Sequence, residues 1–171
     1  MNKNLKLVVI DNKYCDYLRK FDKRVPYNFS NKENRPFIGV LFNIDDIKYF
    51  APLSSPKEKH KIMRNMVDFL KLDDGKLGVV NFNNMIPVLE PNYKLIEFNK
   101  INDVFGYKYN KLLKEQIYWL IRNDEKLYRK SKKLYNDYIN DRINKKIKSR
   151  CCNFKLLEEK CMKYNKELTL V

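Results

Sequence analysis

The chain has 171 residues, and its 36 Lys and Arg residues against 21 Asp and Glu residues leave a net charge of +15. Hydrophobic residues make up 44% of the chain, which is too much apolar material for a disordered basic tail and enough for the core of one domain spanning residues 1–171. No apolar run approaches the roughly 18–20 residues needed to cross a bilayer, so we expect a soluble, cytoplasmic protein with no membrane partner.

The few glycines and cysteines argue against several enzyme classes. The four glycines form neither a phosphate-binding G-x-x-x-x-G-K-[ST] loop nor a dinucleotide-binding G-x-G-x-x-G motif. The four cysteines contain no C-x-x-C pair, and His60 is the only histidine that could complete a metal site. We therefore expect reduced, mostly buried thiols, no metal and no cofactor.

A strand, a helix and a loop are predicted first. Residues 5–10, Leu-Lys-Leu-Val-Val-Ile, predict a strand, and Asp11 or Asn12 can then cap a short helix. Its apolar face would consist of Tyr14, Tyr17, Leu18 and Phe21. Residues 22–36 contain two prolines and many polar side chains, which predicts a loop.

Short β-type runs follow, separated by turn signals such as Asp73-Asp74-Gly75. They cover residues 37–43, 47–53, 69–72, 77–82, 84–89 and 93–98. Only residues 56–68 leave room for a crossover helix, so the pattern favours an antiparallel sheet.

The last third is predicted to be helical from about residue 107. Asn123-Asp124 can end one helix and cap the next, and Asn153 can cap a third. The three apolar stripes are Leu113, Ile117, Leu120 and Ile121, then Leu127, Leu134, Tyr135, Tyr138 and Ile139, then Phe154, Leu157, Cys161 and Tyr164. Strands followed by helices predict an α+β fold.

Positive charge is concentrated in residues 126–150, where ten Lys or Arg residues accompany only Asp137 and Asp141. We expect few of the acidic partners that usually neutralise an exposed helix, so this surface is suited to phosphate backbones, with RNA or single-stranded DNA as the partner. The predicted RNA-binding residues are Lys132, Lys133, Lys145, Lys146, Lys148 and Arg150. The helical spacing of Trp119, Tyr128, Tyr135 and Tyr138 indicates core or groove wall rather than a base-stacking platform.

The densest polar cluster after a predicted strand is residues 52–60, PLSSPKEKH. Ser54 or Ser55 can cap a helix that the following proline and glutamate would favour. The same hydroxyls, together with Lys57 and His60, can instead face a cleft as phosphate-binding or catalytic groups. Taken alone, the cluster favours capping, and the two interpretations are compatible.

The chain also resembles a known family, the ToxN/AbiQ endoribonucleases of type III toxin–antitoxin systems. The resemblance covers most of the chain and rests on the order and spacing of several motifs. They are Lys13-Tyr14, Tyr17-Leu18, Phe21-Asp22-Lys23, Val25-Pro26, Phe37-Ile38-Gly39-Val40, residues 48–57 (KYFAPLSSPK), Leu77-Gly78, Met85-Ile86-Pro87, Ile121-Arg122 and residues 152–160 (CNFKLLEEK).

This resemblance implies a strongly twisted antiparallel sheet flanked by helices, similar to the Kid/MazF-like toxin fold. It also implies metal-independent, sequence-selective RNA cleavage by 2′-hydroxyl attack, which leaves a 2′,3′-cyclic phosphate and a 5′-hydroxyl. The inhibitor would be a small repeated RNA pseudoknot, which the toxin processes and binds in a closed protein–RNA assembly. Released toxin would cut cellular and phage transcripts, causing growth arrest or abortive infection.

The resemblance also implies a set of catalytic residues. The family's hydroxyl pair and lysine fall on Ser54, Ser55 and Lys57. The family also has a basic residue two positions before the Phe-Ile-Gly segment, and this position is Arg35 here instead of a lysine. Arginine suits charge stabilisation rather than proton transfer. Tyr14 matches a tyrosine of the family's first helix and, like Lys57, could move a proton. The family has a further tyrosine in the loop before Arg35; this loop differs in length here, and Tyr27 is the candidate for that tyrosine. The sole histidine, His60, is either an acid–base group or a solvated or substrate-contacting side chain.

Two other interpretations remain open at this point. A non-catalytic RNA-binding module would explain the basic helices and the capping serines without any cleavage. A MazF-like ribonuclease inhibited by a protein would share the fold but not the RNA inhibitor.

Overall fold

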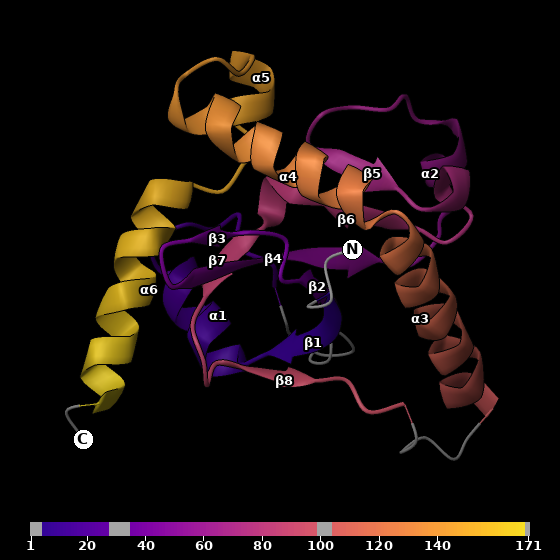
Figure 1. The fold of residues 1–171 in the computed structure, drawn as a ribbon, viewed down its shortest axis with the longest axis horizontal. Coiled ribbons are helices and arrows are strands. Elements are labelled where there is room, and N and C mark those ends of the chain that lie inside the picture. The colour runs from indigo at the N-terminus through magenta and orange to yellow at the C-terminus, as the bar shows by residue number, and fades with distance from the viewer. Residues whose placement is uncertain (1–4, 28–34, 99–103, 170–171) are drawn as a thin grey trace.

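A computed structural model describes residues 5–27, 35–98 and 104–169, and Figure 1 shows the arrangement of their helices and strands. The strands are β1 (Lys6–Ile10), β2 (Phe37–Gly39), β3 (Asn43–Ile44), β4 (Ile47–Ser54), β5 (Phe69–Lys71), β6 (Val79–Asn81), β7 (Ile86–Val88) and β8 (Tyr93–Leu95). The helices are α1 (Asn12–Arg19), α2 (Glu58–Ile62), α3 (Val104–Arg122), α4 (Asp124–Ile139), α5 (Lys145–Lys148) and α6 (Phe154–Thr169). Two single 3-10 turns lie at Asp73–Gly75 and Phe82–Asn84.

Strand β4 is the centre of one eight-stranded antiparallel sheet. The order along the sheet is β5-β6-β4-β2-β1-β8, and β3 and β7 also pair with β4. Both faces of β4 are buried, since Tyr49 and Ala51 on one face and Phe50 and Pro52 on the other are inaccessible to solvent. This antiparallel sheet with helices confirms the α+β prediction.

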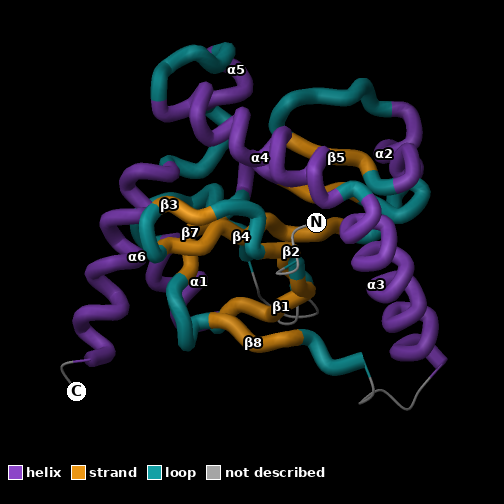
Figure 2. The backbone as a smooth tube through the Cα atoms, viewed as in Figure 1, coloured by secondary structure: helices purple, strands orange, loops and turns teal. Residues whose placement is uncertain are grey.

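The helices surround the sheet, as Figure 2 shows. Helix α6 lies along one side and α3 along the opposite side, and α4 passes over the sheet between them (Figure 2). Helix α6 packs against β7, α1 and α4. The middle strands are therefore enclosed, and the polar ends of strands and their loops remain accessible.

A buried carboxylate joins β4 to the helical third. Glu158 of α6 accepts hydrogen bonds from the hydroxyls of Tyr49 on β4 (2.7 Å) and Tyr135 on α4 (2.6 Å). The rings of Tyr49 and Tyr135 also meet edge to face, with centroids 5.4 Å apart. Burial together with the Glu158 charge raises the pKa of both tyrosines, so both hydroxyls stay protonated and donate.

Most predicted helix boundaries are confirmed. Asp11 caps α1 by accepting from the backbone N–H of Tyr14 at 2.9 Å, and the Asn153 side chain accepts from Leu156 N–H at the start of α6. Asn123 stands at the N-cap position of α4, but its side chain caps nothing there and donates instead to the Trp119 carbonyl.

Several other predictions need correction. The predicted strand 37–43 is two strands, because the backbone leaves the ladder after Gly39 and resumes at Asn43. The short helix α5 was not predicted, and Ile121 is 42% exposed rather than part of the buried stripe of α3. All four cysteines are buried free thiols, as predicted.

Candidate active site

The motif that suggested chemistry lies where β4 leaves the sheet. Ser54 is the last residue of β4, and the exposed segment Ser55–Lys57 then leads into α2. The N-cap residue of α2 is Lys57, with extended backbone (φ −138°, ψ 153°), and no side chain caps this five-residue helix. The capping interpretation of Ser54 and Ser55 is therefore wrong, because the helix begins too late for either hydroxyl to reach its first turn.

The neighbouring strand β6 holds the Ser54 side chain. Asn81 donates a hydrogen bond from its side-chain amide to Ser54 Oγ at 2.9 Å. A hydroxyl that accepts this bond still has its own proton to donate elsewhere. Asn81 was missed because 27 residues separate it from Ser54; only the pairing of β4 with β6 brings them together.

The turn before β6 fits closely under the same segment. Gly78 has a positive φ of +96°, and a Cβ at this position would lie 1.9 Å from the Ser54 carbonyl oxygen. Only glycine combines that backbone conformation with so close an approach. The Leu77-Gly78 motif therefore allows the turn before β6 to pack closely against Ser54. Its position in the sequence did not indicate this contact.

Arg35 joins the serines from strand β2. Pairing of Phe37 with Pro52, and a 2.9 Å hydrogen bond from Leu53 N–H to the Pro36 carbonyl, bring Arg35 just beyond the ladder, across from Ser54. Burial and the nearby charge of Arg19 lower the pKa of the half-buried Arg35 guanidinium from its ordinary value. Arginine starts from so high a value that this side chain keeps its positive charge at neutral pH.

A second arginine and a tyrosine extend this edge. The Arg19 guanidinium lies 4.7 Å above the ring of Tyr27, which is 52% exposed. Both oxygen contacts of Arg19 go to Asp16 Oδ1, at 2.9 and 3.0 Å. Tyr27 thus contacts Arg19, whose charge also acts on Arg35, and a role for Tyr27 in the site stays a prediction. Arg19 was not among the predicted site residues, because no motif around it in the sequence indicates that it lies near Arg35.

His60 lies inside α2 and is only 3% exposed. Burial and the charges of Lys59 and Lys57 lower the pKa of its imidazole, so it is neutral at pH 7. Its Nδ1 atom is buried and has no hydrogen-bond partner among the described residues. The expectation of a solvated histidine is therefore wrong.

Tyr14 lies in the core instead of beside the serines. Its side chain is fully buried, its hydroxyl donates to the Pro87 carbonyl at 2.6 Å, and its ring contacts Tyr164 of α6. Burial and the neighbouring Cys161 raise its pKa well above the ordinary value. A proton-transfer role for Tyr14 disagrees with this placement, because its proton is already bound to a buried carbonyl.

The predicted RNA-binding residues are divided between two helices and the segment after α5. Lys145 and Lys146 are exposed on α5. The other four already have intramolecular contacts: Lys133 with Asp137 (2.6 Å), Lys148 with Asp141 (2.5 Å), Arg150 with Asp68 (2.8 Å), and Lys132 above the ring of Phe42 (4.8 Å). Four of the ten basic residues of 126–150 thus appear in ion pairs, Lys133 and Arg142 with Asp137, Lys148 with Asp141 and Arg150 with Asp68, so the positive charge of this segment is only partly neutralised.

Two features are absent from the described ranges. No three His, Cys, Asp or Glu side chains of residues 5–27, 35–98 and 104–169 come together in a way that could hold a metal ion. In the same ranges, none of the helices combines the length and apolar character that crossing a bilayer requires.

Comparison with known proteins identifies the class of toxin to which this arrangement belongs. Residues 6–162 match the family described as toxin ToxN, type III toxin–antitoxin system. The chain belongs to this family, as its motifs predicted.

Three relatives are similar along nearly the whole chain. Endoribonuclease ToxN of Bacillus thuringiensis subsp. kurstaki is 34% identical, over 94% of this chain and 84% of the relative. Endoribonuclease ToxN of Pectobacterium atrosepticum is 31% identical, over 95% of each protein. Endoribonuclease AbiQ of Lactococcus lactis subsp. lactis is 32% identical, over 96% of this chain and 92% of the relative.

Solved structures show the same fold. One, described as a type III toxin selectively inhibited by a non-coding RNA pseudoknot, has a TM-score of 0.80 at 34% identity and covers 95% of this chain and 99% of that one. AbiQ, described as a lactococcal anti-phage endoribonuclease, has a TM-score of 0.81 at 28% identity and covers 95% and 98%. The further likeness to the Kid/MazF-like fold stays a prediction.

Proposed function

We propose that the chain is a metal-independent, sequence-selective endoribonuclease toxin whose active site lies at the end of β4. The RNA supplies its own nucleophile: the 2′-hydroxyl oxygen attacks the adjacent phosphorus and the bond to the 5′-oxygen breaks. The proton leaves the 2′-oxygen, and the 5′-oxygen gains one. The products are a 2′,3′-cyclic phosphate and a 5′-hydroxyl.

The observation that carries this proposal is the meeting of Arg35 with the Ser54–Lys57 segment. These residues are separated in sequence, but the antiparallel register of β2 with β4 sets Arg35 across from Ser54, and the exposed residues Ser55–Lys57 follow directly. Fixed positive charges and hydrogen-bond donors are what stabilise the extra negative charge of a phosphorane.

Each residue then has a separate task. Arg35 neutralises a non-bridging phosphate oxygen, and its planar guanidinium can bind two oxygens at once. Ser54, which accepts from Asn81, directs its own proton toward the phosphate, and the exposed Ser55 and Lys57 complete the contacts. Because His60 is buried and neutral, we assign it to supporting α2 rather than to contacting RNA.

The same family relationship supports an RNA inhibitor. The similar solved structures are described in terms of a processed non-coding RNA that regulates an antiviral system and of inhibition by an RNA pseudoknot. We extend this to the present chain: one cytoplasmic toxin domain, neutralised by small repeated pseudoknot RNAs in a closed assembly, whose release leads to transcript cleavage and growth arrest or abortive infection. A tandem-repeat non-coding array beside the gene would distinguish this inhibitor from a protein.

The test is cleavage of a labelled RNA by the purified chain in excess EDTA, followed by end-group analysis. We expect cyclic phosphate and 5′-hydroxyl ends, and loss of cleavage in Ser55→Ala and Lys57→Ala with little change in thermal unfolding. Lys61→Ala is the matched control, because this exposed lysine of α2 already pairs with Glu58 and has no assigned contact with RNA. Activity that vanishes with chelator and returns with Mg²⁺ would overturn the mechanism.

A further inference from the structure

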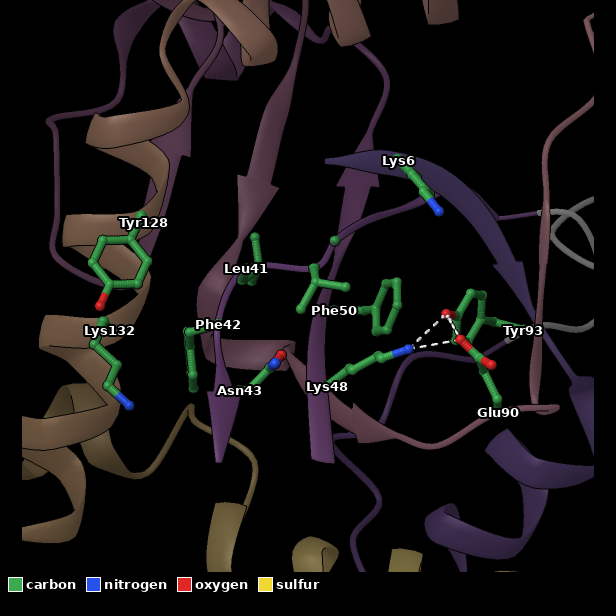
Figure 3. Close-up of a pocket in the computed structure, with 12 residues that line it drawn as sticks. Lys6, Leu41, Phe42, Asn43, Lys48, Phe50, Glu90, Tyr93, Tyr128 and Lys132 are labelled. Atoms are coloured by element: carbon green, nitrogen blue, oxygen red, sulfur yellow. Dashed lines mark hydrogen bonds and ion pairs between the residues drawn. The ribbon is translucent and has the colours of Figure 1, made fainter. Parts of the chain in front are cut away.

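A hollow lies near the start of β4, away from Ser54. It has a volume of about 340 Å³, and Figure 3 shows the side chains around it. Lys48 lines the hollow from β4, and six residues of strand at about 3.3 Å each separate it from Ser54 by roughly 20 Å. The hollow is therefore too distant to receive the phosphate that is cut.

Its rim carries more positive than negative charge. Lys6 from β1, Lys48 from β4 and Lys132 from α4 approach it from three elements (Figure 3). The one acidic residue among its described lining is Glu90, which accepts from Lys48 at 2.6 Å and from the Tyr93 hydroxyl at 2.7 Å. Within the described part of the chain, Lys6 and Lys132 form no ion pair. Lys132 lies above the Phe42 ring at 4.8 Å, a contact that leaves its charge without a neutralising carboxylate.

Aromatic and amide groups provide the walls. Tyr128 is 46% exposed and lies one turn before Lys132 on α4, and the half-buried Tyr93 faces it from the far side (Figure 3). Asn43 is exposed at the rim and offers both a donor and an acceptor. Tyr128 forms a wall of this hollow, as expected, but its exposed ring can also stack on a base, which its helical spacing argued against.

The floor is apolar and closely packed. The Phe50 ring lies directly on Gly39, where a Cβ atom would be 2.3 Å from the ring. A larger residue at position 39 would therefore require this ring to move. An apolar floor under a basic rim suits a unit that joins a planar aromatic group to an anionic one.

RNA offers this combination in one unit. The volume is near the lower end of ligand pockets, about 300–1,000 Å³, so it excludes a duplex but can admit a single group. Proteins read RNA sequence mainly from unstacked nucleotides, whose bases stack on aromatic side chains.

We propose that this hollow binds one unstacked nucleotide of an RNA, with the base against Tyr128 and Asn43 and the neighbouring phosphates toward Lys132 and Lys6. The inference rests on the proposed function, because it adds a binding site for RNA to a chain that cuts RNA elsewhere. The nucleotide can belong either to the folded inhibitory RNA or to a long target transcript.

Binding is measured with a 20-nucleotide, mixed-sequence 2′-O-methyl RNA, which lacks the attacking hydroxyl and cannot be cut. We expect Lys6→Gln/Lys132→Gln to weaken binding and to flatten the slope of log K against log salt by about 0.7 per lost contact. The matched control is Lys111→Gln/Lys163→Gln, which removes two exposed lysines of α3 and α6 and is expected to leave affinity unchanged. Equal slopes and affinities for wild type and the Lys6/Lys132 variant would overturn the proposal.

The stacking contact is tested separately at Tyr128. Tyr128→Ala is expected to weaken binding of the same RNA on the order of 5- to 100-fold, whereas Tyr128→Phe keeps the ring and restores most of the affinity. Photocrosslinking of a 5-iodouridine-substituted RNA should label the peptide that contains Tyr128 or Tyr93. Crosslinks confined to other peptides, with Tyr128→Ala binding normally, would refute this site.

Two further measurements identify the source of the nucleotide. If it belongs to the inhibitory RNA, the Lys6/Lys132 variant stays toxic and resists neutralisation by its repeat RNA. If it belongs to transcripts, the variant cuts a long RNA more slowly and a hexanucleotide at the normal rate. If the variant binds RNA more weakly but the wild type cuts no RNA, the binding site in the hollow is supported and the nuclease function is rejected. If the variant binds normally and the wild type cuts RNA, the nuclease function is supported and the binding site is rejected.

Discussion

The hydrogen bond between Asn81 and Ser54 allows a test of how the proposed active site is organised. The Asn81 amide lies 2.9 Å from Ser54 Oγ, and no role in contacting RNA is assigned to it. Asn81→Ala removes the donor and leaves the serine free to rotate. If the bond serves to aim the hydroxyl, the variant is expected to bind RNA normally and to cut it more slowly.

The size of the effect follows from the kind of bond. A hydrogen bond between neutral groups contributes about 0.5–1.5 kcal/mol. Since each 1.36 kcal/mol is a factor of ten in rate, Asn81→Ala should reduce kcat about 2- to 12-fold. Ser54→Ala removes a donor to the developing charge itself, and losses of this kind are about 100- to 1,000-fold.

Single-turnover cleavage of a labelled oligonucleotide measures both variants and their combination. Because Asn81 acts through Ser54, adding Asn81→Ala to Ser54→Ala should cause no further loss. Asn83→Ala is the control, since the Asn83 amide donates to the Arg150 carbonyl away from the serine. Multiplicative losses in the double variant, or a changed KM with an unchanged kcat, would refute this positioning role.

Three further predictions concern stability and RNA affinity. Gly78→Ala should lower the free energy of unfolding by more than about 1 kcal/mol, because φ is +96° and a Cβ would meet the Ser54 carbonyl. Urea denaturation measures this change, and equal midpoints for the variant and the wild type would contradict it. Since burial lowers the pKa of His60, its contribution to stability is present above the ordinary value of 6.5 and is lost as pH falls through the lowered value. His60→Asn should therefore make the melting temperature less dependent on pH below about 6.5, and an unchanged pH profile would contradict this. Lys145→Gln/Lys146→Gln should weaken RNA binding in filter-binding titrations. The slope of log K against log salt should become less steep by about 0.7–0.9 per lost phosphate contact, and an unchanged slope would show that α5 does not contact the RNA.

Features encoded by neighbouring residues were predictable from the sequence. The strands and their turns were found because apolar runs and Asp, Asn, Gly and Pro signals are local. The caps Asp11 and Asn153 act on N–H groups three residues away, so spacing alone reveals them. The break after Gly39 is different, because it depends on how the following residues meet β4.

The candidate site shows where local signals end. The serines and Lys57 are adjacent in the chain, whereas Arg35 and Asn81 reach them only through strand pairing. Tyr14 shows the opposite failure: its helical spacing with apolar neighbours indicated burial, and the family resemblance assigned it to the site instead. The structure agrees with the spacing.

The buried Glu158 carboxylate has a consequence for how the toxin is made. It ties Tyr49 of β4 to a helix 109 residues further along the chain, and Asp22 similarly accepts from the backbone of Asn153, 131 residues away. Contacts across such separations form late in folding. While the chain is being synthesised, the strand that carries the proposed active site still lacks its partner from the last segment to be translated. We therefore expect that the ribosome-bound chain does not cleave its own mRNA and that the inhibitory RNA needs to bind only the completed protein.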